Sequence, residues 1–361
     1  MNRTSIDRLN DDDHKRSESG EKVTITQIAN ELGIAPSSVS RALNNRPGVS
    51  RRLQDEIQAY AKRVGYVPVS SPANQNAPNM IAMIIGDIRN PFYADLVFYT
   101  QKELSARGYQ LCIFNSEYME SKEIEYLHIV DRFNFAGVIQ MNVATEHISH
   151  VLKNLSTPVV MVNRIISSFD GDNVLLDNYE AGYVVTRHLV ELGHSKIGFI
   201  LGQKESSSCN QRFAGFQQAL KNYNIDINPR HILQGDLTLE TGLELASDFA
   251  ALNDKPSAMV VSNDLTAHGF ISGCMQHGIC VPDELSVASF DNISFSSIGT
   301  TTLTSIDPNV KQMAKIAVRL MIERIEHPEK ETERVVLKPV LVERKSTAPF
   351  RNRSVALAPH L

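Results

Sequence analysis

The chain has 361 residues, of which 42% are hydrophobic and 21% charged, and its formal net charge is −5. Such a length predicts two or three domains, and no apolar run reaches membrane-spanning length. The first residues lack the basic-then-apolar order of a signal peptide, so we expect a cytoplasmic protein. The four cysteines form no CxxC pair and no cluster with histidine, which argues against disulfides and a cysteine-bound metal.

The charge is unevenly distributed along the chain. Residues 22–66 contain seven Lys or Arg and three Asp or Glu, a balance of +4, which leaves −9 for the remainder. A basic module on an acidic body lets one part meet nucleic-acid phosphates while the rest is repelled. The polar segment 1–21, with its acidic patches, predicts a disordered tail.

Residues 23–45 have the pattern of two short helices joined by a tight turn. Ile25, Ile28 and Leu32 recur at helical spacing, and Gly33 suits a turn with positive φ. Pro36 suits the first turn of a second helix, whose small and basic residues face outward. This pattern favours a helix-turn-helix that lays its second helix in the DNA major groove, with an ordinary helical hairpin as the alternative. A third helix over 51–64 should complete the core, and 69–79 (VSSPANQNAPN) is expected to be a linker.

From residue 80 onward, short apolar runs alternate with amphipathic helices. Unbroken apolar runs are typical of buried parallel strands, and their alternation with helices predicts a doubly wound α/β fold. The expected strands are IAMIIG, YQLCIFN, AGVIQM, PVVMVN, NVLLD, KIGFILG, AMVVSN and LSVASFD. Neither a GxGxxG motif after the first strand nor a GxxxxGK[ST] motif is present, so we expect no dinucleotide or nucleotide cofactor.

Several separate motifs occur in order along the first part of the chain: Gln27-Ile28-Ala29, Val39-Ser40-Arg41-Ala42-Leu43-Asn44, Val49-Ser50 and Gly65-Tyr66-Val67-Pro68. In these motifs the chain resembles the LacI/GalR family of bacterial transcription regulators, and the likeness continues to about residue 347. The resemblance implies an all-α helix-turn-helix headpiece at 22–68 and a hinge or linker at 69–79. It also implies a two-lobed body at 80–347, like a periplasmic binding protein with doubly wound parallel sheets, followed by a tail at 348–361.

The same likeness divides the body into lobes and assigns its contacts. The first lobe would comprise about 79–177 and 309–328, and the second about 178–308 and 329–347. By the resemblance, DNA would be contacted by Thr26, Pro36, Ser37, Ser38, Arg41, Asn44 and Ser50. The ligand between the lobes would be contacted by Asn90, Phe92, Tyr93, Arg164, Asp177, Arg212, Asn263 and Asp291.

Some of these residues have a structural alternative. Phe92 and Tyr93 would also suit the core at a helix start, and Asp177 and Asp264 would also suit helix caps. The chain departs from the family at Asn163, where Asp is commoner, and at Ser289, where the family has Gly.

The linker also departs from the family pattern. Pro72 and Gln75 stand in place of a hinge helix with an apolar wedge, which predicts weak bending of the operator.

We therefore expect a homodimeric transcription repressor that binds a pseudo-palindromic operator and a carbohydrate-like effector: a sugar, sugar acid or nucleoside. The helices at 93–107 and 310–325 are candidates for the subunit contact. A solute-binding protein for transport is the alternative, disfavoured by the N-terminal module. An enzyme is not expected, because no nucleophile–base pair is evident, and His188, His194 and His268 form no metal-binding pattern.

Overall fold

The computed structural model describes residues 24–43, 49–64, 79–141, 146–166 and 168–351. The contacts divide the chain into two compact units, with the boundary in the sequence between Pro78 and Asn79. The expected tails and the linker with Pro72 and Gln75 lie largely outside the described residues. Within those ranges, no helix is both long and apolar enough to cross a membrane.

The first unit contains the three expected helices, α2 (Ile25–Leu32), α3 (Pro36–Leu43) and α4 (Arg51–Arg63). Thr24 and Gln27 cap the start of α2 reciprocally, and Gly33 ends it with φ 66°. The three helices enclose a small apolar core made of Ile28, Ala29, Val39, Ala42, Ile57 and Ala61. Pro36 and Arg41 of α3 lie outside this core and are exposed.

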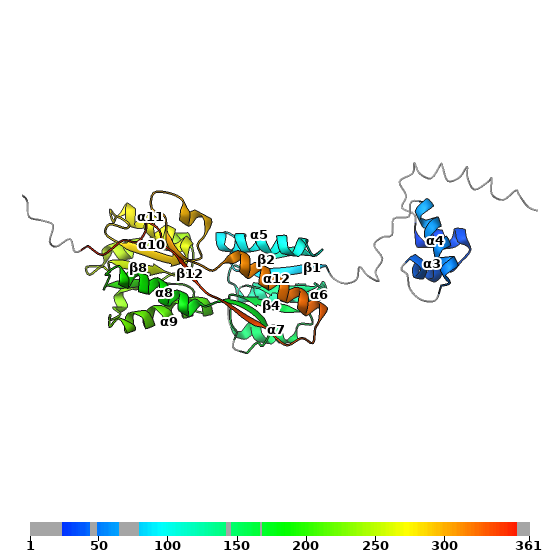
Figure 1. The fold of residues 1–361 in the computed structure, drawn as a ribbon, viewed down its shortest axis with the longest axis horizontal. Coiled ribbons are helices and arrows are strands. Elements are labelled where there is room, and N and C mark those ends of the chain that lie inside the picture. The colour runs from blue at the N-terminus through cyan, green and yellow to red at the C-terminus, as the bar shows by residue number, and fades with distance from the viewer. Residues whose placement is uncertain (1–23, 44–48, 65–78, 142–145, 167, 352–361) are drawn as a thin grey trace, which may run out of the picture. The chain divides into compact units, whose positions relative to one another are not determined.

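The second unit contains two six-stranded sheets, each flanked by helices (Figure 1). The strands of the first sheet are all parallel, in the order β11-β5-β4-β3-β1-β2. Their bounds are β1 (Met80–Ile85), β2 (Gln110–Asn115), β3 (Gly137–Gln140), β4 (Val159–Val162), β5 (Asp172–Leu176) and β11 (Arg334–Leu337). The helices of this lobe are α5 (Pro91–Ser105), α6 (Glu120–Arg132), η1 (Glu146–Ile148), α7 (Ser149–Asn154) and α12 (Val310–Glu326).

The second sheet has the order β12-β10-β9-β8-β6-β7, in which only β12 is antiparallel to its neighbour. Its strands are β6 (Ile197–Leu201), β7 (Ile232–Gln234), β8 (Ala258–Val261), β9 (Ser286–Phe290), β10 (Thr304–Asp307) and β12 (Val340–Val342). Its helices are α8 (Asn178–Glu191), α9 (Ser207–Asn222), η2 (Pro229–His231), α10 (Leu239–Ala251), α11 (Asp264–Gln276) and η3 (Ser294–Ser297).

All eight expected strands form, and their apolar runs lie in parallel sheets as predicted. The expectation that 329–347 belongs to the second lobe needs correction, because this stretch is divided between the sheets. β11 pairs with the otherwise open edge of β5 in the first sheet, and β12 pairs with β10 in the second. The chain therefore passes between the lobes after β5, after β10 and after β11, and these crossings bring the carboxyl ends of both sheets toward each other.

Candidate ligand cleft and nucleic-acid interface

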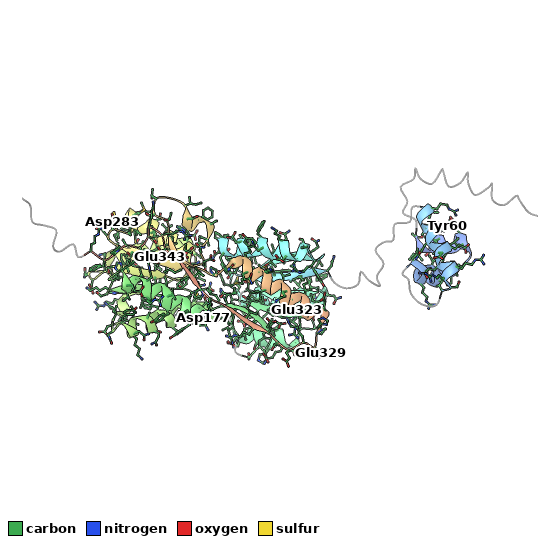
Figure 2. All side chains as sticks on the ribbon, in the orientation of Figure 1. Tyr60, Asp177, Asp283, Glu323, Glu329 and Glu343 are labelled. Atoms are coloured by element: carbon green, nitrogen blue, oxygen red, sulfur yellow. The ribbon has the colours of Figure 1, made fainter. Side chains whose placement is uncertain are left out.

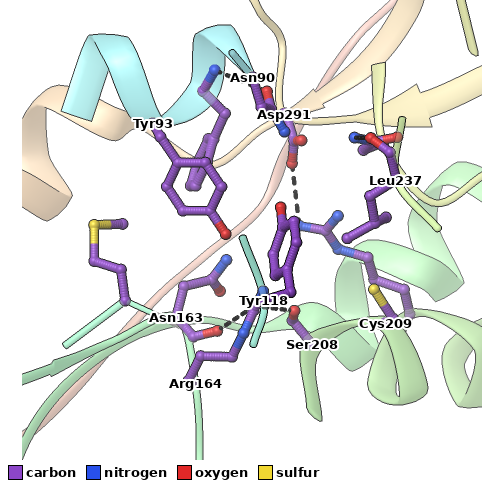
Figure 3. A pocket seen from close by; sticks show the side chains of 13 residues that line it. Asn90, Tyr93, Tyr118, Asn163, Arg164, Ser208, Cys209, Leu237 and Asp291 are labelled. Atoms are coloured by element: carbon purple, nitrogen blue, oxygen red, sulfur yellow. Dashed lines mark hydrogen bonds and ion pairs between the residues drawn. The ribbon is translucent and has the colours of Figure 1, made fainter. Parts of the chain in front are cut away.

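A small cavity lies between the two lobes, where loops follow the carboxyl ends of β1, β4, β8 and β9 (Figure 3). Its lining comes from both lobes: Asn90, Phe92, Tyr93, Tyr118, Met141, Asn163, Arg164, Ser208, Cys209, Arg212, Leu237, Asn263 and Asp291. Seven of the eight residues proposed from the sequence as ligand contacts are among them. These residues are far apart in the sequence. They come together because each lies near the end of a strand or the start of a helix, on the edges of the two sheets that face each other.

Arg212 is held in the cleft by three polar contacts within its own lobe and the adjoining crossing. Its Nε donates to Asn178 Oδ1 at 2.9 Å, and its Nη1 donates to the Ser262 carbonyl at 2.6 Å. Its Nη2 lies 3.3 Å from Asp291 Oδ1, and its guanidinium carbon lies 4.6 Å from the centre of the Phe290 ring. The planar fork of arginine suits such a site because it can address several acceptors at fixed angles.

The position of Arg212 depends on close packing between α8 and α9. A Cβ on Gly182 would lie 2.0 Å from the Arg212 carbonyl oxygen, and one on Gly215 would lie 2.0 Å from the Tyr179 carbonyl oxygen. The residues of the motif Arg212-Phe213-Ala214-Gly215-Phe216 thus have different structural roles. The arginine reaches the cleft, the glycine permits the helix contact, and Phe216 is fully buried in the core.

Two cleft residues at strand ends have left-handed backbone conformations. Asn163 follows β4 with φ 54°, and Asp291 follows β9 with φ 103°. Non-glycine residues in such conformations concentrate at functional sites, where surrounding contacts maintain them. Burial raises the pKa of Asp291, although the neighbouring Arg212 guanidinium acts in the opposite direction.

Arg164 lies on the first-lobe side of the cleft and links it to the second. Its Nη1 donates to the carbonyl of Asn163 and to Ser208 Oγ at the start of α9. The amide of Ile165 donates to Ser207 Oγ at 3.1 Å, so two neighbouring bonds join the lobes. Arg164 is 5% exposed, and its Nε has no hydrogen-bond partner.

The aromatic residues occupy the first-lobe wall. Asn90 caps α5 by accepting from the Phe92 amide, which aims the following two rings into the body. The rings of Phe92 and Tyr93 lie 5.4 Å apart, and Tyr93 lies 6.5 Å from Tyr118. Phe92 and Tyr93 are both buried and both line the cavity, so core packing and access to the cleft coincide in these residues.

Asp177 is the exception among the proposed ligand residues. Asp177, whose position is labelled in Figure 2, is not among the lining residues of the cavity. It caps α8, accepting from the Glu180 amide at 2.9 Å. The structure thus has the helix cap that the sequence offered as the alternative to a ligand contact. Asn263 does line the cavity, yet it also caps α11 and donates to the Leu237 carbonyl, so both ends of its amide are occupied.

Asp264 belongs to a polar cluster behind the cleft. Its carboxylate accepts from Ser289, Ser296 and Ser305 and from the Ile293 amide. Burial raises the pKa of Asp264 to about 7, partly offset by these hydrogen bonds. Ser289, which stands where the family has glycine, is therefore a hydrogen-bond donor to this carboxylate and not a lining residue of the cleft.

Six lining residues were not proposed from the sequence as ligand contacts: Tyr118, Met141, Asn163, Ser208, Cys209 and Leu237. Tyr118 follows β2 and Met141 follows β3, so the rule of strand ends could have found them. Ser208, Cys209 and Leu237 lie on or before helices of the second lobe, and only the way the lobes meet brings them to the cleft.

The enclosed space is about 30 Å³. Ligand pockets are on the order of 300–1,000 Å³. With the lobes placed as they are here, the space is smaller than such pockets.

Of the proposed DNA contacts in the first unit, Pro36, Ser38 and Arg41 lie on α3, Thr26 lies near the start of α2, and Ser50 directly precedes α4. Thr26, Pro36, Arg41 and Ser50 are exposed, and Ser38 is half-buried. Ser50 Oγ also accepts from the Leu53 amide at 3.4 Å, as a cap of α4. The side chain of Ser37 and the whole of Asn44 lie outside the described residues.

No cluster of His, Cys, Asp or Glu suited to a metal ion occurs in the part of the chain that the structure describes. His188 bonds to Thr347, His194 to Ser257 and the Ala348 carbonyl, and His268 to Ser296. These histidines serve as packing and hydrogen-bonding residues.

Comparisons with known proteins agree with this architecture. A periplasmic binding protein-like domain matches residues 186–347. The chain is 32% identical over 329 residues to the NTD biosynthesis operon regulator NtdR of Bacillus subtilis, covering 90% of this chain and 99% of the relative. It is 28% identical over 327 residues to the HTH-type transcriptional repressor PurR of Photobacterium profundum, covering 90% and 98%.

A solved structure is also similar to this chain in its three-dimensional fold. The body is similar to a LacI family transcriptional regulator from Enterococcus faecium with bound ribose, with a TM-score of 0.69 and 26% identity. That match covers 75% of this chain and 100% of the other. The fold and cleft define a DNA-binding transcription regulator controlled by a small metabolite. The chain belongs to the LacI/GalR family of bacterial transcription regulators.

Proposed function

We propose that this protein is a homodimeric repressor whose affinity for an operator is controlled by an organic metabolite bound between its lobes. The observation that carries the proposal is the Arg212–Asp291 pair, a buried donor and acceptor at a cavity shared by two lobes. Such a pair can hold hydroxyl or carboxyl groups of a metabolite and would report its presence through lobe closure.

We propose that the exposed face of α3 contacts the base edges of the DNA. Arg41 would read a base edge, with Pro36, Ser37, Ser38 and Asn44 alongside it. Thr26 and Ser50 would contact phosphates. The positive charge of residues 22–66 supports this assignment, because phosphate contacts supply most of the affinity of such modules. A repressor that acts on the chromosome would work in the cytoplasm.

The homodimer is supported by apolar side chains that remain exposed. Phe98 of α5 is 60% exposed and Met275 of α11 is 61% exposed, while Phe295 and Ile298 near η3 are 58% and 63% exposed. In the view of Figure 1, α5 and α11 lie along the same side of the body. Exposed apolar groups of this size favour association, and a two-fold operator calls for a two-fold protein.

Two other functions have less support. A transport protein would have no use for the basic three-helix unit. Catalysis would need a nucleophile and base in the cleft, yet Cys209 and Ser208 have no histidine among the residues that line the cavity with them. We therefore propose binding and not catalysis as the activity of this site.

The decisive experiment selects operator sequences from random duplexes with the full chain and then titrates the selected site by fluorescence anisotropy. We expect Arg41→Ala to weaken binding by about 1–3 kcal/mol if it reads a guanine edge. Arg132→Ala, at the end of α6, is the matched loss of an exposed arginine and should leave affinity unchanged. Failure to select any sequence at low salt would refute the proposed repressor.

A further inference from the structure

The cleft has an excess of positive charge. Its charged lining residues are Arg164, Arg212 and Asp291, and the last two are paired with each other. Among the described residues, no carboxylate lies within ion-pair distance of Arg164, whose hydrogen-bond partners are neutral oxygens. The gap at 142–145 contains Asn, Val, Ala and Thr, so it adds no acidic residue to the cleft. Asp291 stabilises the charge of Arg164 only from beyond ion-pair distance, and it is itself paired with Arg212. A buried guanidinium without a direct ion pair is costly, and an anionic ligand would compensate it.

A relay of amides fixes the orientation of Asn163. Arg212 Nε can only donate, so the atom of Asn178 that receives it must be the oxygen. The Asn178 nitrogen then donates to Asn163 Oδ1 at 2.9 Å. Asn163 consequently has its Nδ2 left as a donor at the cleft. An aspartate at this position would instead place a negative charge beside Arg164.

The remaining polar groups of the first-lobe wall also offer donors. Asn90 uses its Oδ1 to cap α5, which leaves its nitrogen. Burial raises the pKa of Tyr93, and raises that of Tyr118 well above its ordinary value, so both phenols keep their protons. The two phenols also hydrogen-bond to each other, which uses one of these protons. With Arg164, this wall has three kinds of donor group (amide, phenol and guanidinium), and its described lining residues include no carboxylate. Asp291, on the opposite lobe, is the one acidic lining residue.

We propose that the effector carries an anionic group, a carboxylate or a phosphate, which Arg164 Nε and Asn163 Nδ2 bind on the first-lobe side of the cleft. The hydroxyl groups of the same metabolite would face Asp291. This assignment rests on the proposed function of the cleft and narrows it to an acidic metabolite. Figure 3 shows Asn163 and Arg164 on one side of the cavity and Asp291 on the other.

The test is calorimetric titration of the full chain with matched neutral and acidic sugars at constant ionic strength. The pairs are D-glucose with D-glucuronate, D-galactose with D-galacturonate, and D-glucose with glucose 6-phosphate. We expect at least one acid to bind about tenfold or more tightly than its neutral partner, because hydrogen bonds to charged groups are the stronger ones. The uronate and phosphate arms distinguish the two sources of the anion.

Two variants assign the preference to the named residues. Arg164→Gln should weaken binding of the preferred acid by about tenfold to a hundredfold. Asn163→Asp keeps the size of the side chain but turns the donor into an acceptor, so it should reduce the ratio of acidic to neutral affinity. The control is Arg89→Gln, which removes the same charge from an exposed arginine paired with Asp87 outside the cavity lining.

The outcomes separate this inference from the function on which it rests. If the neutral member of each pair binds more tightly, and Arg212→Ala still abolishes that binding, the anionic effector is refuted while the metabolite cleft stands. If binding is unchanged by substitutions at Arg164, Asn163 and Arg212 alike, the metabolite does not bind between the lobes and the proposed function is also refuted.

Discussion

Arg164 of the first lobe donates a hydrogen bond to Ser208 of the second, so a residue available to a ligand also holds the cleft closed. The adjacent Ile165–Ser207 bond reinforces this junction. A ligand that binds Arg164 would therefore either replace or add to the contacts that fix the distance between the lobes. If the proposed ligand contact is correct, affinity for the effector and the separation of the lobes are coupled through this one side chain.

Ser208→Ala should shift the body toward a more open arrangement, because Arg164 loses its partner across the cleft. The expected result is faster hydrogen exchange at the Ile165 amide and at the start of α9, measured by mass spectrometry on the full chain. Ser121→Ala, at an exposed position of α6, serves as the control. Unchanged exchange across the Ile165 segment would show that this bond does not hold the lobes together.

Gly215→Ala should disturb the cleft from a distance. Its Cβ would lie 2.0 Å from the Tyr179 carbonyl oxygen, so α8 and α9 must move apart. We expect the free energy of unfolding to fall by about 1–3 kcal/mol, as in other overpacked cores, and ligand affinity to fall as Arg212 shifts. Urea unfolding measures the first effect. Gln217→Ala on the exposed side of α9 should match the wild type, and equal stability of both variants would contradict the packing argument.

Asp172→Ala should destabilise the first lobe. Its side chain is fully buried and accepts from Arg324 Nε and the Glu333 amide, both at 2.8 Å, which fixes the chain just before β11. Removing one member of a buried pair costs about 3–5 kcal/mol. The comparison is Lys196→Ala, which breaks a solvent-exposed pair with Asp254 and should therefore change the stability far less. If urea unfolding gives similar losses for both, the anchoring role of Asp172 is excluded.

Asp264 predicts a dependence of stability on pH. An unfolded aspartate titrates near 3.8, whereas burial raises the pKa of Asp264 to about 7 in the folded protein. The folded state therefore binds this proton more tightly, and the stabilisation from it is full below about pH 4 and lost as the pH rises to about 7.

Asp264→Asn should remove that part of the slope. Free energies of unfolding at pH 5 and pH 8 measure it, with Asp226→Asn in an exposed turn as the control for carboxylate loss. The Asp264→Asn protein should also be less stable at both pH values, since its amide nitrogen faces donors from Ser289 and Ser305 or from Ser296 and Ile293. Identical slopes for wild type and Asp264→Asn would contradict the raised pKa.

Much of the fold could be predicted because its signals are local. The run of apolar residues at β1 and the Gly33 turn each specify an element within a few positions. The polar strand β10 and the short strands β7, β11 and β12 were not predicted. They depend on pairing with strands distant in sequence, and β11 has half its residues exposed. Local patterns cannot report such partners.

The candidate site was predictable for side chains at strand ends, such as Arg164 and Asp291, and less so elsewhere. Asp177 and Asp291 both follow an apolar strand in the sequence. Asp177 nevertheless caps a helix, whereas Asp291 pairs with an arginine from α9. Only the crossing of the chain between the lobes decides which carboxylate reaches the cleft.

By itself, the sequence determined a basic helix-turn-helix unit, a two-lobed α/β body and the motif residues that resemble one regulator family. The tertiary structure alone decided which donors remain unsatisfied in the cleft. The reason is that the free Asn163 nitrogen depends on Arg212 and Asn178, and the free Arg164 Nε on the absence of a nearby carboxylate among the described residues. Hydrogen bonding is settled only when every partner is in place, and no single segment of the chain contains all of these partners.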